Sequence, residues 1–202
     1  MNGAVIVETR NVNIESVINR HMKYLPEWEC TVFGWNNFSN IKLSNFDCHI
    51  NYLNLWQNIH TSKEYNELLT NVEFWKLIPY DKILMFQSDS GILKEGIDQF
   101  LKWDWVGAPW TFQQFGGNGG LSIRSKEIML EITKRFKYNY DCNEDVFFCN
   151  QMAGHRIGKL APRSICEQFS VEAIYKLGTF GYHSIDKHCT ASQCEKIYSQ
   201  YD

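Results

Sequence analysis

A polar run, Gln87, Ser88, Asp89 and Ser90, follows four apolar residues at positions 83–86. A short apolar run with polar residues on both sides is typical of a buried strand in an α/β sheet. Open α/β sheets bind their ligands just beyond the carboxyl ends of the strands. Asp89 is therefore a candidate metal or phosphate ligand, although an aspartate at this position can also simply cap a following helix.

Two further sets of residues could carry chemistry. Glu144 and Asp145 are adjacent carboxylates at a predicted helix start. One of them could act as a general base, or both could serve only to stabilise the helix dipole. His183 is in a polar segment and could join a distant carboxylate in holding Mn²⁺, whose remaining positions would go to phosphate and water. A single histidine is also compatible with an ordinary surface or core position.

Four glycines fall within five positions at Gly116, Gly117, Gly119 and Gly120. Glycine allows positive φ and close backbone approach, so this segment could present N–H groups to a phosphate or a sugar hydroxyl. A flexible hairpin loop is the alternative interpretation. The spacing fits neither a dinucleotide fingerprint nor a P-loop.

Alternating strands and helices are predicted to position these residues. Apolar runs indicate strands at 4–7, 31–33 and 82–87, a less regular strand at 47–53, and extended segments around 106 and 121–123. Helical periodicity predicts helices over 13–25, from Thr61 to about 75, near 94–101, after Ser125 and after Asn143. The chain is expected to be irregular beyond Gly158. This alternation favours a layered α/β fold.

Composition narrows the class of protein. A chain of 202 residues with 44% hydrophobic residues is expected to form one domain over 1–202. The net charge is -3 and no Lys/Arg run is present, which argues against nucleic acid as a partner. Seven scattered cysteines without a CxxC pair indicate reduced thiols. With no leader and no membrane-spanning run, the expected location is the cytoplasm, or the host cytoplasm for a viral protein, unless the chain is a trimmed catalytic part.

The order of the segments resembles that of a family of uncharacterised glycosyltransferase-like proteins from bacteria, fungi and large DNA viruses, over about residues 4–185. More distantly it is similar to GT-A nucleotide-sugar transferases of the fringe and β-1,4-galactosyltransferase type. The resemblance implies a GT-A-like, Rossmann-like mixed sheet flanked by helices. The segments that carry it are Glu8-Thr-Arg10, residues 87–90, Gly107-Ala-Pro-Trp110, residues 117–124, Glu144-Asp145, Phe169-Ser-Val-Glu172 and Gly181-Tyr-His183.

The resemblance also implies roles for individual residues. Asp89 and His183 would hold the metal, Mn²⁺ or Mg²⁺, on the diphosphate of the donor. Asp145 would be the catalytic base, with Glu144 beside it at the helix start. The residues expected to bind donor and acceptor are Thr9, Arg10, Gln87, Ser88, Trp110, Asn118, Gly119 and Gly120.

One position departs from the family pattern. Gln87 stands where the DxD motif has its first aspartate. Because glutamine is neutral, the metal could be held only together with the diphosphate. A metal-free mechanism, in which Arg or Lys neutralises the diphosphate, stays open.

The expected function is transfer of a sugar from a nucleotide-diphosphate sugar, with UDP as the expected nucleotide, to a hydroxyl of a glycan or glycoprotein, with inversion. Two alternatives remain. A non-catalytic carbohydrate or nucleotide-sugar-binding protein would be compatible with Gln87. A sugar nucleotidyltransferase would need a basic glycine-rich loop after the first strand, where this chain has residues 8–11 and no glycine.

Overall fold

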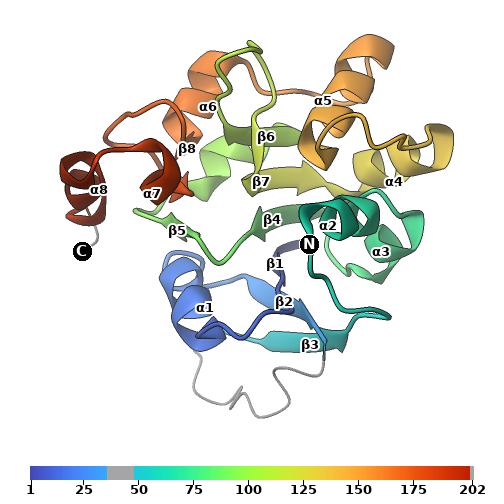
Figure 1. The fold of residues 1–202 in the computed structure, drawn as a ribbon, viewed down its shortest axis with the longest axis horizontal. Coiled ribbons are helices and arrows are strands. Elements are labelled where there is room, and N and C mark those ends of the chain that lie inside the picture. Colours follow the sequence, from blue (N-terminus) through green and yellow to red (C-terminus); the bar gives the residue numbers. More distant parts are fainter. Residues whose placement is uncertain (36–47, 201–202) are drawn as a thin grey trace.

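The computed structural model describes residues 1–35 and 48–200. A six-stranded mixed sheet forms its centre, in the order β3-β2-β1-β4-β7-β6 (Figure 1). The first four of these strands run parallel, and β7 and β6 are antiparallel to their neighbours. The strands are β1 (Asn2–Val7), β2 (Glu29–Gly34), β3 (Ile50–Asn54), β4 (Lys82–Phe86), β6 (Trp105–Ala108) and β7 (Asn118–Ser125).

Helices cover both faces of this sheet, so its central strands are buried on both sides. Ala4 and Ile6 of β1 pack with α1 and α6, whereas Val5 and Val7 pack on the opposite face with α2 to α5. The predicted α/β layering is thus confirmed. The helices are α1 (Ile14–Met22), α2 (Ser62–Leu69), α3 (Val72–Leu77), the 3-10 helix η2 (Ile97–Phe100), α4 (Lys126–Arg135), α5 (Glu144–His155), α6 (Arg163–Phe169), α7 (Ile185–His188) and α8 (Ala191–Tyr198).

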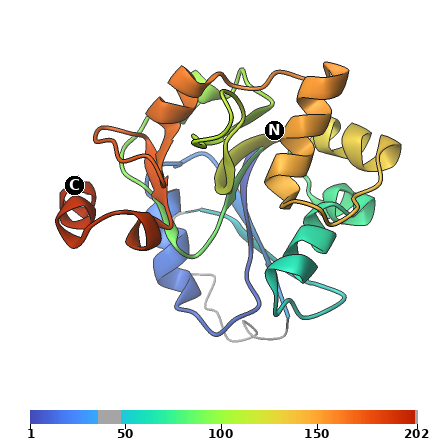
Figure 2. The same cartoon turned by 45° about the horizontal axis from the view of Figure 1, so that its top comes forward.

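A second, three-stranded sheet lies beside the first, in the order β5 (Ser90–Ile92), β9 (Gly181–His183) and β8 (Ser170–Val171). Figure 2 shows α7 and α8 next to this sheet, at the carboxyl end of the chain. The prediction of irregular structure beyond Gly158 was therefore wrong. Strands of two or three residues are too short to produce a readable alternation, and the pairing of β5 with β9 joins segments about 90 residues apart.

Two boundaries differ from the predicted ones. The capping box of Thr61 and Glu64 is confirmed, but the helix that follows is broken in two. Asn71 starts α3, and its side chain accepts a hydrogen bond from the N–H of Glu73. The predicted strand at 47–53 is observed as β3 from residue 50, while its first residue, Asp47, lies outside the described residues.

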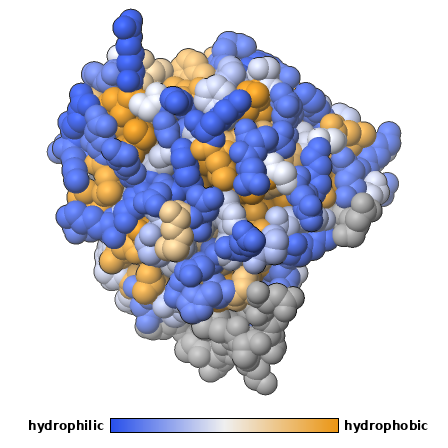
Figure 3. Space-filling view, turned by 180° about the vertical axis from the view of Figure 1, so that it is seen from behind, coloured by the Kyte–Doolittle hydropathy of each residue, from blue (hydrophilic) through white to orange (hydrophobic). Residues whose placement is uncertain are grey.

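The surface opposite the view of Figure 1 carries small, separate apolar patches among hydrophilic side chains (Figure 3). Among the helices of the described residues, none is both long and apolar enough to cross a membrane.

Candidate active site

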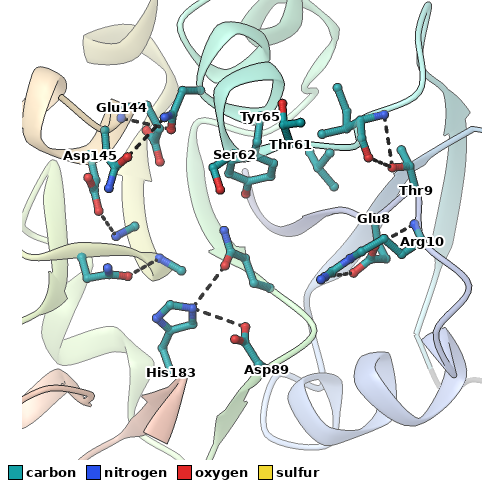
Figure 4. A pocket seen from close by; sticks show the side chains of 18 of the residues that line it. Glu8, Thr9, Arg10, Thr61, Ser62, Tyr65, Asp89, Glu144, Asp145 and His183 are labelled. Carbon is teal, nitrogen blue, oxygen red and sulfur yellow. Dashed lines mark hydrogen bonds and ion pairs between the residues drawn. The ribbon is translucent and has the colours of Figure 1, made fainter. Parts of the chain in front are cut away.

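A cleft of about 440 Å³ opens at the carboxyl ends of β1 and β4, a volume within the usual range of small-molecule sites. Figure 4 shows Glu144 and Asp145 on one side, residues 8–10 on another, and Asp89 with His183 between them. Residues 59–62, Tyr65 and Asn66 add a further wall. The predicted site residues that line the cleft are Thr9, Arg10, Gln87, Asp89, Asn118, Gly119, Gly120, Glu144, Asp145 and His183.

A buried ion pair forms the base of the Glu144 side of the cleft. Both carboxylate oxygens of Glu144 accept hydrogen bonds from Arg124, from Nη1 at 2.8 Å and Nη2 at 2.9 Å. The Arg124 side chain has no exposed surface, and its guanidinium lies 4.2 Å from the ring centroid of Trp105. Both carboxylate oxygens of Glu144 are thus engaged by Arg124. Of the two adjacent carboxylates, Asp145 is therefore the one that can bind a ligand.

Asp145 lies in the first turn of α5 and faces the cleft. Its Oδ2 accepts a hydrogen bond from the N–H of Gly119 at 3.0 Å, and its Oδ1 accepts one from Val146 at 2.8 Å. Burial raises the pKa of Asp145 above its usual value, although these two N–H groups act in the opposite direction. Each carboxylate oxygen keeps a second lone pair. A carboxylate of raised basicity in this position is suited to accept a proton.

The glycines of this wall lie in a strand and not in a flexible loop. Positive φ occurs at Gly116 and Gly117, whereas Gly119 and Gly120 begin β7 without it. Space is what requires glycine at the latter two positions. A Cβ on Gly119 would lie 2.7 Å from Oε1 of Glu144, and one on Gly120 would lie 2.1 Å from Nε2 of His183. The alternative interpretation, a flexible hairpin loop over all four glycines, therefore does not hold for Gly119 and Gly120.

A second side of the cleft gathers nitrogen and oxygen atoms around His183. This group lies between the other two sides of the cleft (Figure 4). Nε2 of His183 lies 3.2 Å from Oε1 of Gln87 and 3.3 Å from Oδ1 of Asp89. Its Nδ1 lies 3.1 Å from the carboxylate of Glu172. Burial lowers the pKa of His183, but the bonds and charges of Asp89 and Glu172 outweigh that effect and raise it to about 9. Burial likewise opposes ionisation of Asp89, yet His183 and Lys187 hold the pKa of this carboxyl well below its usual range.

The oxygens of Gln87 and Asp89 are ligands that Mn²⁺ or Mg²⁺ accepts, and Nε2 of His183 would join them once it releases the proton that its raised pKa retains at neutral pH. Glu172 on Nδ1 fixes the imidazole so that Nε2 points to Gln87 and Asp89, which is the usual arrangement behind a metal-bound histidine. Among the described residues, no three His, Cys, Asp or Glu side chains are arranged as a ready metal site. Asp89, His183 and the neutral amide of Gln87 would hold such an ion. A bound ligand would have to supply the remaining coordination positions. His188, an alternative ligand, lies 3.9 Å from Glu172 and does not line the cleft.

The third side of the cleft is held by Thr9 and Arg10. The Thr9 hydroxyl donates to the carbonyl of Ile59 at 2.7 Å and accepts from its N–H at 3.3 Å. Arg10 donates through Nε and Nη2 to both carboxylate oxygens of Glu8, and through Nη2 to the hydroxyl of Ser88. These contacts fix the segment that leads into α2 and the end of β1 relative to the turn after β4.

Two predicted residues lie outside the lining of the cleft. Ser88 accepts hydrogen bonds behind it, at its hydroxyl from Arg10 and at its carbonyl from Arg20. Trp110 is buried and stacks on Phe112 at 5.3 Å between ring centroids. The structure thus gives Trp110 a packing contact and does not bring it to the other site residues.

Sequence reasoning assigned no role to four residues that the site uses: Tyr65, Arg124, Glu172 and Lys187. Burial and the charge of Glu144 raise the pKa of Tyr65, which lines the cleft, to about 12. Arg124 did carry a signal, because it directly follows the predicted extended segment 121–123 and an arginine is seldom buried without a carboxylate partner. The other two follow only from pairing in the small sheet, because β8 with β9 sets Glu172 beside His183 and β5 with β9 sets Lys187 near Asp89.

The chain belongs to the family described as "Protein of unknown function (DUF5672)", which matches residues 48–183. No curated protein matches the sequence. The apo form of the glycosyltransferase GlyE from Streptococcus pneumoniae TIGR4 has a similar structure, with a TM-score of 0.55 and 12% identity over 95% of this chain and 55% of GlyE. TarS 1–349 from S. aureus gives a TM-score of 0.47 and 14% identity over 73% of this chain and 53% of TarS.

The likeness to GlyE shows a shared fold, and the predicted GT-A-like class of fold is confirmed. The chain spans about half the length of these two proteins. The comparisons support a distant glycosyltransferase-like fold and do not support the more specific link to fringe and β-1,4-galactosyltransferase enzymes.

Replacing Gly120 by alanine should displace His183, because the new Cβ would overlap the imidazole. We expect the free energy of unfolding to fall by about 1–3 kcal/mol, as in other overpacked sites. Urea denaturation measures this change. Gly154→Ala is the control, because a Cβ there meets nothing within 4 Å, and it should stabilise α5 by about 0.5–1 kcal/mol. Equal effects of the two variants would contradict the steric role of Gly120.

Replacing Arg124 by methionine should leave Glu144 buried without a partner. The expected loss in the free energy of unfolding is about 3–5 kcal/mol, and adding Glu144→Leu should recover most of it. Lys76→Met is the control, because Lys76 pairs with Glu73 at 2.7 Å on the surface and should cost less than about 1 kcal/mol. Denaturant unfolding of all three variants tests this, and a loss for Arg124→Met no larger than the control would count against a structural ion pair.

Proposed function

We propose that this protein is a glycosyltransferase that moves a sugar from a nucleotide-diphosphate sugar to a hydroxyl acceptor. The observation that carries the proposal is the layout of the cleft. A buried carboxylate, Asp145, and the group of Gln87, Asp89 and His183 line the same cleft, and the adjacent residues Gly119 and Gly120 contact Asp145 and His183 respectively. The cleft lies where open α/β sheets bind ligands, and the fold is one that glycosyltransferases use.

The wall of Asp89 and His183 would receive the diphosphate of the donor. Together with the amide oxygen of Gln87, these side chains would hold Mn²⁺ or Mg²⁺. The bound ion would neutralise the charge that develops on the departing diphosphate. Glu172 keeps the His183 ring oriented. Thr9 and Arg10 form the end of the cleft that remains for the nucleoside of the donor. The expected donor nucleotide is UDP.

Asp145 would act as the base on the acceptor. Its carboxylate takes the proton of the acceptor hydroxyl while that oxygen forms a bond to the anomeric carbon. The bond from this carbon to the diphosphate oxygen breaks, and the diphosphate leaves with the electron pair. A single displacement of this kind inverts the anomeric configuration. Glu144 serves to hold Arg124, and Arg124 in turn holds the carbonyl of Gly119 at 3.1 Å.

A second candidate function is nucleotide-sugar binding without turnover. Gln87 favours it, because its neutral amide lies next to His183 where a second carboxylate would strengthen metal binding. Hydrolysis of nucleotide sugars in the absence of acceptor would separate an enzyme from a binding protein.

Asp145→Asn should remove proton-accepting power while keeping the size of the side chain. We expect the affinity for the donor nucleotide, measured by calorimetry, to stay nearly unchanged, because a base acts mainly in the transition state. Sugar transfer to simple glycoside acceptors should fall by roughly 10²–10⁴-fold. Asp141→Asn, an exposed change just before α5, is the matched control and should transfer normally. Wild-type transfer by Asp145→Asn would exclude this mechanism, as would a product of retained anomeric configuration in its NMR spectrum.

Asp89→Ala should abolish Mn²⁺-dependent binding of a nucleoside diphosphate and leave the protein folded, since this side chain is partly exposed. A thermal-shift series with UDP, with and without Mn²⁺, measures the effect. In the wild-type protein, ligand at 100 times its Kd should add roughly 2.7 kcal/mol to the stability. Asp98→Ala on η2 is an exposed control. Equal shifts for Asp89→Ala and the wild type would move the metal site elsewhere.

A further inference from the structure

Lys187 is held above Asp89 by the way β9 ends. The pairing of β5 with β9 places Ser90 opposite His183, and the N–H of Ser184 donates to the carbonyl of Asp89 at 2.9 Å. The short helix α7 follows at once, and the N–H of Lys187 donates to the carbonyl of Ser184 at 3.1 Å. As a result, Nζ of Lys187 lies 3.2 Å from Oδ2 of Asp89. The pairing of β5 with β9 therefore positions Lys187 next to Asp89, and the contact is not a chance one between surface side chains.

The two oxygens of Asp89 are divided between different partners. Oδ1 faces Nε2 of His183 at 3.3 Å, and Oδ2 faces Lys187. An ammonium on Oδ2 reduces the charge that the carboxylate can offer to a metal ion. The Lys187 side chain is 71% exposed, so its flexible stem can leave this position without disturbing packed neighbours.

The pairing of the charges that line the cleft indicates Lys187 as the group that would bind phosphate. Arg10 is bound through two nitrogens to the carboxylate of Glu8, and Glu144 is matched by Arg124. Lys187 is the lining lysine at the Asp89 end, where the diphosphate is proposed to bind. A diphosphate entering beside Asp89 and Asp145 needs positive charge, and ammonium groups form strong hydrogen bonds to phosphate oxygens.

We propose that Lys187 exchanges partners when the donor binds, and this inference rests on the proposed function. In the free protein the ammonium neutralises Asp89. When a nucleoside diphosphate enters, the ammonium moves to the phosphate oxygens and releases Oδ2 of Asp89 for the metal ion. Lys187 thereby couples the binding of diphosphate and metal, because each ligand strengthens the binding of the other.

The variant Lys187→Gln tests the exchange because its effects on two ligands have opposite signs. Affinity for Mn²⁺ alone should rise about two- to fivefold, since a competing surface ion pair is removed. Affinity for UDP at saturating Mn²⁺ should fall roughly tenfold, since charge-assisted hydrogen bonds to phosphate are lost. Titration calorimetry measures both, and it also gives the factor by which UDP strengthens Mn²⁺ binding, which should be about two- to fivefold smaller in the variant.

Lys76→Gln is the matched control, because Lys76 is also an exposed lysine in an ion pair and lies outside the cleft. It should leave both affinities unchanged. If the wild type responds to UDP and Mn²⁺ but Lys187→Gln binds both with wild-type affinity, or loses affinity for both, the exchange is overturned and the proposed function stands. If the wild-type protein binds none of UDP, GDP, ADP, CDP and dTDP, with or without Mn²⁺, both the proposed function and the exchange fail.

Discussion

A fully buried guanidinium sets the strongest constraint in this fold. Arg124 lies within β7, paired with Ile83 on one side and Trp105 on the other, so it cannot reach solvent. A charge in this position costs several kcal/mol unless a partner and hydrogen bonds compensate it. Glu144 supplies the charge, and the carbonyl of Gly119 and the hydroxyl of Ser122 supply further bonds. The requirement of one side chain thus ties the start of α5 to the start of β7, and the cleft forms at that corner.

Much of the fold could be predicted because its long elements carry local patterns. The apolar runs of β1 and β4 and the helical spacing of α1 are visible without knowledge of any neighbour. The break between α2 and α3 was missed because the apolar spacing continues across it, while Asn71 caps a new helix. The small sheet was missed because β8 and β9 are two and three residues long and gain their order from pairing with a segment far away in the sequence.

The candidate site was likewise predictable only in part. Asp89, Asp145 and His183 were predicted to share a site, and the structure places all three on one cleft, because the order of the motifs is informative even where each motif is weak. Their supporting partners were not predictable. The contact of Glu172 depends on the pairing of β8 with β9, and that of Lys187 depends on how β9 and α7 meet the turn after β4. The role expected for positive φ at Gly119 was replaced by one of space, which no single sequence reveals.

Two consecutive glycines connect two sides of the cleft. Gly119 donates its N–H to Asp145, and Gly120 lies directly against the ring of His183. Consecutive Cα atoms are about 3.8 Å apart across a rigid trans peptide. The carboxylate and the imidazole are therefore related through one rigid peptide unit, one hydrogen bond and one packing contact. A shift in the backbone of β7 at these two glycines would therefore move the proposed base and the proposed metal ligand together.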